Sequence, residues 1–199
     1  MKKFELTAES KINIFGKKLF RIKALISFGD VEEGETGGWI EKEENLEQSS
    51  GNAWVYGNAE VYGNAWVYGN AEVYGNARVY GNAWVSGNAR VSGDAEVSGN
   101  AWVYGNVEVS GNARVSGNAE VSGNADYTTI HGFGTQFRTT TFFQCEDKQI
   151  RVSCGCFLGT IPEFREQVKN TREGKIAEEY LMIADLMEKH FVKEKESGE

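Results

Sequence analysis

The chain has 199 residues, which is enough for one or two ordinary domains. Its net charge of −8 disfavours binding to a nucleic-acid backbone or to an anionic membrane surface, so neither is expected as a partner. No apolar run is long enough to span a membrane and no apolar signal core follows Met1; together with an odd number of cysteines, three, this predicts a cytoplasmic protein without a disulfide framework.

Residues 1–50 are not repetitive and are predicted to form an N-terminal β cap. Apolar residues alternate with polar ones around Ile12–Ile14 and Phe20–Ala24, which is strand periodicity, and Gly16–Lys18 between them suggests a hairpin turn. The stretch that follows, "FGDVEEGETGGWIEKEENLEQ", is a glycine-rich acidic loop. We expect it to cover the first coil of the repeat that comes next, because an open end would leave backbone groups unpaired.

Residues 51–125 repeat a six-residue phrase, G-N-A-x-V-(Y/S), twelve times before Gly123. Successive side chains of a strand point to opposite faces, so Ala and Val share one face while x and Tyr/Ser share the other. The apolar pair is expected to point inward. Gly-Asn is expected to form the corner, because these residues tolerate backbone angles that others avoid.

This spacing resembles the left-handed parallel β-helix of hexapeptide-repeat proteins, in which three repeats close one triangular coil of about 18 residues. The fold class predicted is therefore mainly β: a left-handed parallel β-helix of about four coils with an N-terminal β cap and a C-terminal cap of a β-hairpin and two helices. Coils of such a helix stack ~4.8 Å apart.

A coil of this length sorts the outward x positions into three columns. One column alternates in charge, with Glu60, Arg78, Glu96 and Arg114. A second runs Trp54, Glu72, Arg90, Glu108 and Asp126. The third runs Trp66, Trp84, Trp102 and Glu120, beside a Tyr/Ser column of Tyr68, Ser86, Tyr104 and Ser122.

The third column predicts an aromatic surface, and its candidate partner-binding residues are Trp66, Trp84, Trp102, Tyr68 and Tyr104. Aromatic side chains bury ~150–250 Å² each, so the part left exposed would rival the largest apolar patch of a typical monomer. Four interpretations stay open: packing within the chain, self-association as a homodimer or trimer, binding of a different protein, and stacking of sugars on the indoles.

Residues 126–199 are predicted to form an α+β cap. Strands are expected near 139–145 and 149–154 with a turn at 146–148, followed by a helix that starts in a capping box at Thr160–Glu163. A second helix carries an apolar stripe from Ile176 to Phe191, and the tail 193–199 is expected to be disordered.

Cys145, Cys154 and Cys156 gather in the predicted hairpin, and with His131 they number four potential metal ligands. Cys-x-Cys is an uncommon spacing for structural zinc, and free cysteines are usually buried apolar groups. We therefore predict no metal site and no cofactor. Whether Cys145, Cys154 and Cys156 bind a metal ion is left open at this point.

Many hexapeptide-repeat proteins are acyltransferases, which need a histidine base and a groove between coils for the acyl carrier. The repeat here has no histidine and no inserted loop. His190 falls on a predicted helix, so His131 is the remaining candidate base, and no residue near it is spaced to act with it. No catalytic residue is predicted, and acyl transfer remains the alternative function.

The acidic loop leading into the hexads, followed by "TFFQCEDKQIRVSCGCFLGT", resembles phage and prophage proteins often labelled hexapeptide transferases or polymer-forming proteins. The resemblance implies a capped β-helix of viral origin, with Cys154–Phe157 as a marker of the C-terminal cap. The expected role is that of a non-catalytic module that offers its aromatic, mildly acidic surface to itself or to a bacterial host protein. The resemblance implies that such a host protein could be a defence system, inhibited in the manner of an anti-CRISPR. A structural or carbohydrate-contacting protein of the phage particle is a further alternative.

Overall fold

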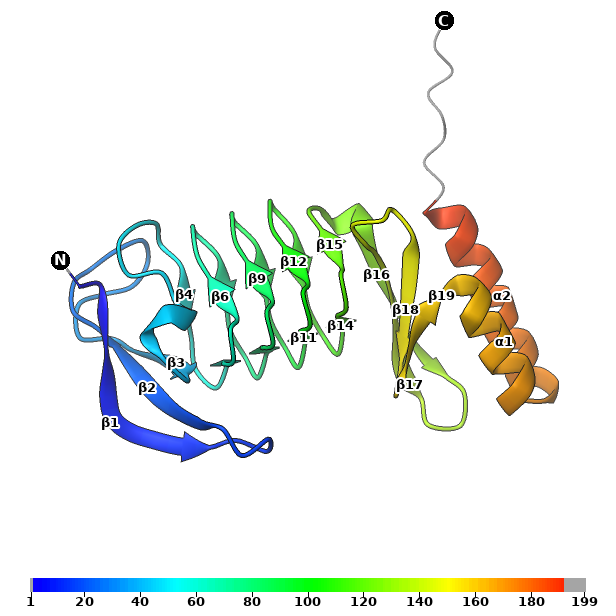
Figure 1. Cartoon of the computed structure of the whole chain (residues 1–199), viewed down its shortest axis with the longest axis horizontal. Helices are drawn as coiled ribbons and strands as arrows, with labels where there is room; N and C mark the ends of the chain where they lie inside the picture. Colours follow the sequence, from blue (N-terminus) through cyan, green and yellow to red (C-terminus); the bar gives the residue numbers. More distant parts are fainter. Residues whose placement is uncertain (1, 192–199) are drawn as a thin grey trace, which may run out of the picture. The chain divides into compact units, whose positions relative to one another are not determined.

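The computed structural model describes residues 2–191 and divides the chain into two compact units, Met1–Asn124 and Ala125–Glu199. The first unit is a parallel β-solenoid and the second an antiparallel sheet with two helices, as Figure 1 shows. The predicted disordered tail, residues 193–199, lies outside the described residues.

The solenoid is built from three sheets of short parallel strands. The strands of each hexad cover only its x and Val positions, and every third strand joins the same sheet. The first sheet contains β3 (Thr36–Ile40), β5 (Glu60–Val61), β8 (Arg78–Val79), β11 (Glu96–Val97) and β14 (Arg114–Val115); the second β4 (Trp54–Val55), β7 (Glu72–Val73), β10 (Arg90–Val91) and β13 (Glu108–Val109); the third β6 (Trp66–Val67), β9 (Trp84–Val85), β12 (Trp102–Val103) and β15 (Glu120–Val121).

Strand pairing confirms the predicted coil of three repeats. Trp66 pairs with Trp84, and Trp84 with Trp102, while Val pairs with Val at the neighbouring positions. Backbone hydrogen bonds join successive coils, for example from Trp84 N to Ala101 O at 2.8 Å and from Ser86 N to Val103 O at 2.9 Å. The predicted columns are therefore real neighbours in space.

The inside of the solenoid is filled by the repeated Ala and Val side chains. Those from Ala53 to Val121 are at most 2 % exposed. Small side chains are needed here because the three walls of the coil approach one another closely, and such close-packed cores tolerate little added volume. This confirms the predicted inward face.

The corners depend on glycine and asparagine as predicted. Repeat glycines from Gly51 to Gly117 have positive φ, a region that side chains with a Cβ rarely enter. The asparagines that follow them stack in ladders, and Asn64, Asn82, Asn100 and Asn118 are joined amide to amide by hydrogen bonds of 3.0–3.2 Å. The corner amides thus bond to one another from coil to coil along this edge.

The solenoid starts earlier than the repeat. The predicted covering loop lies against the first coil as expected, and it does so as a turn of its own: Trp39 and Ile40 of β3 pair in parallel with Glu60 and Val61, and Leu46 bridges to Val67. This raises the count to about five turns rather than four. Gly37 and Gly38 make the turn possible, since a Cβ on Gly38 would lie 2.6 Å from Val55 Cγ1.

The edge of this first turn is covered by a hairpin of β1 (Phe4–Ile12) and β2 (Lys18–Ala24), which continues the first sheet in the antiparallel sense. The turn between them lies where the sequence predicts it, but the first strand precedes the predicted Ile12–Ile14. Ile12 ends the strand and Ile14 lies beyond it, and both are exposed because the packed side of β1 is formed by earlier residues such as Phe4.

One predicted column member is misplaced. Asp126 lies in the 3₁₀ turn η2 (Asn124–Asp126) instead of stacking as a strand residue below Glu108. The side chain of Asn124 explains the end of the solenoid: its Oδ1 accepts a hydrogen bond from Glu108 N at 3.0 Å, where the next coil would supply a carbonyl.

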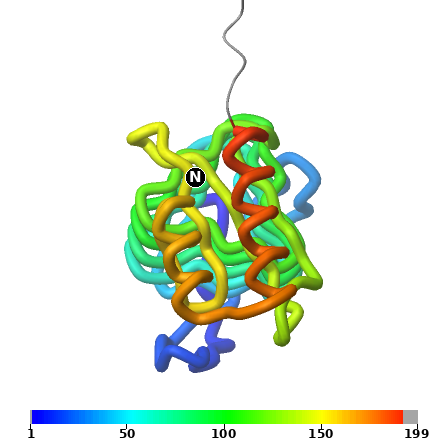
Figure 2. Tube along the Cα trace, turned by 90° about the vertical axis from the view of Figure 1, so that its right-hand side faces the viewer, coloured from blue at the N-terminus to red at the C-terminus, as the bar shows by residue number. Residues whose placement is uncertain are grey.

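The second unit is a four-stranded antiparallel sheet of β16 (Tyr127–Phe133), β17 (Arg138–Gln144), β18 (Ile150–Cys154) and β19 (Phe157–Thr160). The predicted hairpin is its central pair, and the two outer strands are additions. Helices α1 (Ile161–Thr171) and α2 (Gly174–His190) lie side by side (Figure 2). The Thr160–Glu163 capping box forms as predicted. In the described part of the chain, no helix combines the length and apolarity needed to cross a membrane.

The corner glycines provide a test of the close coil-to-coil approach. An alanine Cβ at Gly87 would lie 2.8 Å from Gly105 N, whereas one at Gly57 meets nothing within 4 Å, and φ is positive at both positions. Gly57→Ala should cost only the left-handed strain, about 1–2 kcal/mol. Gly87→Ala should cost roughly 1–3 kcal/mol more, because the obstructing atoms belong to the backbone. Urea unfolding measures both, and equal losses would contradict the geometry.

A buried lysine gives the N-terminal edge a pH dependence. Lys3 is 4 % exposed, donates to Ala53 O at 3.1 Å and lies over the Phe28 ring. Burial lowers the pKa of Lys3 to about 8, against an opposing effect of the Glu47 carboxylate.

Between pH 8 and pH 10.5 the unfolded chain therefore binds more protons at this site than the folded chain, so stability rises with pH. From pH 8 to pH 10 the gain should be on the order of 2 kcal/mol. Urea unfolding of the wild type and Lys3→Met across this window measures the gain. The same pH slope in both proteins would show that Lys3 is not its source.

Candidate docking face

The third sheet of the solenoid carries the predicted aromatic column on its outer side. Val67, Val85 and Val103 point inward from β6, β9 and β12, so the neighbouring tryptophans point outward. We call this surface the aromatic face and define it by five residues: Trp66, Trp84, Trp102, Tyr68 and Tyr104.

Four of these rings form a continuous contact series. Trp66 stacks on Tyr68 with ring centroids 4.1 Å apart, and it meets Trp84 edge to face at 5.9 Å. Trp84 then stacks on Trp102 at 5.2 Å with ring planes only 2° apart. The hydroxyl of Tyr104 donates to Glu120 Oε1 at 2.9 Å, which anchors the far end of the face. The structure brings all five predicted residues onto one side.

Stacking does not hide these rings. Trp84 remains 38 % exposed and Trp102 49 % exposed, while Trp66, Tyr68 and Tyr104 are half-buried. Large exposed indoles held in a parallel stack form a rigid apolar surface, and such surfaces are typical of contact sites. The ring contacts preorganise the face, so little side-chain entropy remains to be lost on binding.

The outer positions of the other two sheets form ion-pair ladders instead. On the second sheet Arg90 binds Glu72 at 3.0 Å, and on the first sheet Glu96 lies between Arg78 and Arg114. Glu60 does not pair with Arg78 but with the hairpin, through Lys11 at 2.7 Å and Asn13 at 3.2 Å. These ladders are solvated walls, each pair worth ~0.2–1 kcal/mol.

A second aromatic stack on the first sheet is covered from within the chain. Tyr62 and Tyr80 stack at 5.1 Å, and Phe15 from the β1–β2 hairpin contacts both rings. Tyr62 is 4 % exposed, and its burial raises the pKa of its hydroxyl. The hairpin therefore covers part of this stack from within the same chain.

The histidines and cysteines do not converge on a site. His131 is exposed on β16, with Nδ1 3.2 Å from Thr139 Oγ1, and His190 ends α2. The three thiols are free; Cys145 is buried, which raises its pKa to about 11, while Cys154 is half-buried and Cys156 exposed. Within residues 2–191 no three His, Cys, Asp or Glu side chains are grouped to hold a metal ion.

Comparison with known proteins supports the solenoid repeat. The family model described as the YdcK beta solenoid repeat matches residues 71–87, 89–105 and 109–123. Each matched segment is close to one coil in length, so the match and the strand register describe the same unit. No curated protein matches the chain.

Two tryptophans at equivalent repeat positions separate structural from surface roles. Trp54 is fully buried between Phe4 and Phe28, whereas Trp84 is exposed on the aromatic face. Trp54→Ala should lower the free energy of unfolding by about 3–5 kcal/mol. Trp84→Ala removes ring contacts but leaves no internal cavity, and should cost only ~1 kcal/mol. Chemical denaturation of both variants tests this, and comparable losses would make the aromatic face a folding element.

Proposed function

We propose that the protein is a non-catalytic binding module that associates with a second copy of itself through the aromatic face. The observation that carries this proposal is the parallel stack of Trp84 on Trp102, rigid and still substantially exposed. These rings hold one another in place and still leave apolar area exposed, which is what a preformed contact surface requires.

The charge distribution favours a second copy on this wall. The chain has a net charge of −8, so two copies repel one another on average. The five residues of the aromatic face carry no formal charge at pH 7, whereas the walls of the first and second sheets carry Glu and Arg. Contact through the aromatic face brings together the least charged surface and leaves the ladders in water.

The order of side chains on this face suits a two-fold axis. Along the column the face has Trp66, Trp84 and Trp102, flanked by Tyr68, Ser86 and Tyr104. Read from either end, the first series is Trp-Trp-Trp and the second is Tyr-Ser-Tyr. Both are therefore symmetric about the coil that contains Trp84 and Ser86. In an antiparallel pair with the axis at this coil, Trp66 lies opposite the second copy's Trp102. This self-complementarity is what an isologous interface requires.

The second sheet lacks this property. Its ladder of Glu72, Arg90 and Glu108 would place Arg90 opposite Arg90 and Glu72 opposite Glu108 about the equivalent axis. A parallel pairing of the aromatic faces would likewise place the two Glu120 carboxylates opposite one another. Like charges in contact oppose association, so the antiparallel pair through the third sheet is the arrangement we propose.

The size of the face sets the expected strength. Five aromatic side chains, already partly covered by one another, offer a few hundred Å² per copy. This is at the low end for specific interfaces, so association in the micromolar range is expected. A bacterial host protein, which the resemblance to phage proteins would favour, is the alternative occupant of the same face.

The test is sedimentation velocity of the wild type, Trp84→Arg and Glu108→Arg across 1–200 µM, a range set by the expected affinity. Trp84→Arg places a charge at the proposed two-fold axis and should abolish self-association, with an unchanged circular dichroism spectrum. Glu108→Arg places the same side chain at the same repeat position on the second sheet, and should associate as the wild type does.

A wild type that stays monomeric at 200 µM would overturn self-association. The wild type could instead stay monomeric and capture a purified host protein, with capture lost in Trp84→Arg but kept in Glu108→Arg. That result would show that the aromatic face binds the host protein and not a second copy. Equal effects of the two variants would contradict any role of the aromatic face.

A further inference from the structure

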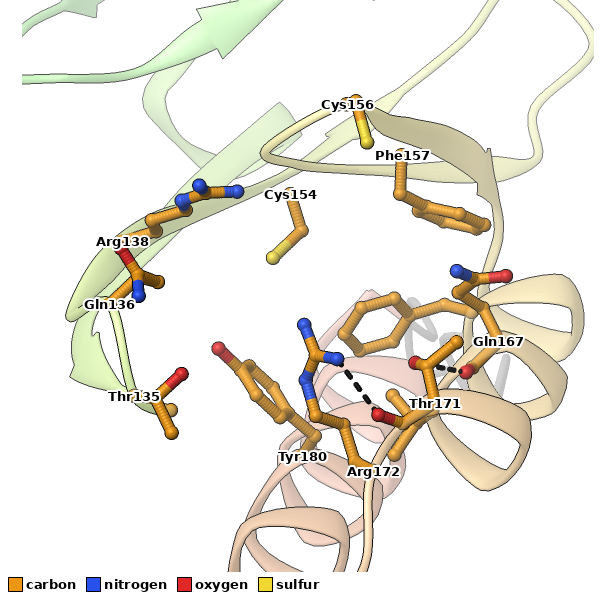
Figure 3. Close-up of a pocket in the computed structure, with 13 residues that line it drawn as sticks. Thr135, Gln136, Arg138, Cys154, Cys156, Phe157, Gln167, Thr171, Arg172 and Tyr180 are labelled. Carbon is orange, nitrogen blue, oxygen red and sulfur yellow. Dashed lines mark hydrogen bonds between the residues drawn. The ribbon is translucent and has the colours of Figure 1, made fainter.

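The second unit contains a pocket that the sequence patterns did not reveal. It encloses about 110 Å³ between the ends of β16, β17 and β18 and the two helices (Figure 3). Its polar lining comes from distant parts of the chain: Thr135, Gln136 and Arg138 before β17 and at its start, Cys154 at the end of β18, and Arg172 and Tyr180 from the helical region. All of these residues belong to one compact unit.

The charge of this pocket is opposite to that of the chain. Arg138 and Arg172 line it, and none of its lining residues is an aspartate or glutamate. Neither guanidinium makes an ion pair with another residue of the described chain, although Arg172 Nη1 donates to Thr171 O at 2.8 Å. Both arginines are exposed at the mouth of the pocket, and guanidinium groups suit oxyanions because their N–H groups match the geometry of carboxylate and phosphate.

Two glycines allow polar side chains of the pocket lining to lie close to the backbone. Gly134 and Gly155 both have positive φ, and both lie where an added Cβ would collide with a lining side chain. At Gly134 the Cβ would be 2.5 Å from Tyr180 Oη, and at Gly155 it would be 2.5 Å from Arg138 Nη1. The central residue of the Cys154–Cys156 turn thus makes room for the Arg138 guanidinium.

The opposite side of the pocket is apolar. Phe164 contacts Phe157 at 5.6 Å and Tyr180 at 5.8 Å, and Val168 lies one helical turn further along α1. Tyr180 is itself 7 % exposed, and its hydroxyl donates to Phe133 O at 3.2 Å. The pocket therefore combines a fixed apolar floor with cationic groups at its rim.

We propose that this pocket binds a small oxyanion, with the anionic oxygens between Arg138 and Arg172 and any short apolar body against Phe164 and Val168. A short-chain carboxylate and a phosphate share this chemistry, and the apolar floor distinguishes them, since only the carboxylate can cover it. The site is separate from the aromatic face, so it neither requires nor excludes self-association.

Cys154 provides a reporter at the wall of the pocket. Its thiol accepts a hydrogen bond from Thr140 Oγ1 at 3.2 Å, and Figure 3 shows the sulfur directed toward the space that Arg172 and Tyr180 face. A bound anion would block the approach of a reagent to this sulfur. Cys156 is exposed on the same turn and serves as an internal reference.

The experiment uses the full chain and three probes at equal ionic strength: butyrate, inorganic phosphate and the neutral analogue butyramide, with sodium chloride as the baseline. Binding is followed by amide chemical shifts of Gly134 and Gly155 and by alkylation of Cys154 with neutral iodoacetamide, read by peptide mass spectrometry relative to Cys156. Butyrate or phosphate should shift both amides and slow alkylation at Cys154, and butyramide should do neither.

Arg138→Gln and Arg172→Gln should each weaken the binding of the anion about tenfold, the effect expected for removing one charge-assisted hydrogen bond. Lys169 lies in the last turn of α1, just before Arg172, but does not line the pocket. Lys169→Gln should therefore leave binding of the anion unchanged. Shifts no larger than those in sodium chloride, equal binding of butyramide, or unchanged binding in both arginine variants would overturn the proposal.

Discussion

The structure depends on one constraint: three six-residue repeats close one coil, so each residue lies directly over its equivalent in the next. Backbone hydrogen bonds between coils then run along all three walls, as in the pair Trp84 N to Ala101 O. Inside, the constraint restricts the core to Ala and Val. Outside, it sorts the variable position of the repeat into three columns: two in which Glu and Arg alternate and one that contains three successive tryptophans.

These columns show how a nearly uniform fold acquires distinct surfaces. Where charges alternate, as between Arg78, Glu96 and Arg114, the wall satisfies itself. Where aromatic rings gather next to the N-terminal hairpin, Phe15 covers Tyr62 and Tyr80. On the third wall the stacked rings of Trp84 and Trp102 remain exposed, whereas on the first wall Tyr62 is buried and the exposed ring is that of the covering Phe15. Specificity in such a protein lies in which column stays uncovered.

The sequence predicted most of the solenoid because its period is strict. Spacing alone predicted the strand register, the inward Ala and Val, and the glycine corners. In the second unit it also predicted the capping box at Thr160. The extra turn at Trp39–Leu46 was not predicted, since its two rungs do not follow the hexad. Nor was the fate of Trp54, which occupies an outward repeat position yet is buried, because its covering rings Phe4 and Phe28 come from outside the repeat.

The two candidate sites differ in the same way. The aromatic face could be predicted residue by residue, since a single period places its members together. The pocket could not, because Arg138 is far in sequence from Arg172 and Tyr180. Neither arginine belongs to a pattern, and the apolar stripe that contains Tyr180 predicts only packing. The close approach of the Arg138 guanidinium to Gly155 likewise becomes visible only in the structure.

The central claim concerns the arrangement of two copies on the third wall, and isotope-filtered nuclear Overhauser spectra test it most directly. In an equimolar mixture of protein with labelled tryptophan and unlabelled protein, the antiparallel pair predicts intermolecular contacts between the rings of Trp66 and Trp102. Contacts between Trp66 and Trp66 instead, or no intermolecular signal from these rings at concentrations where the protein sediments as a dimer, would contradict it.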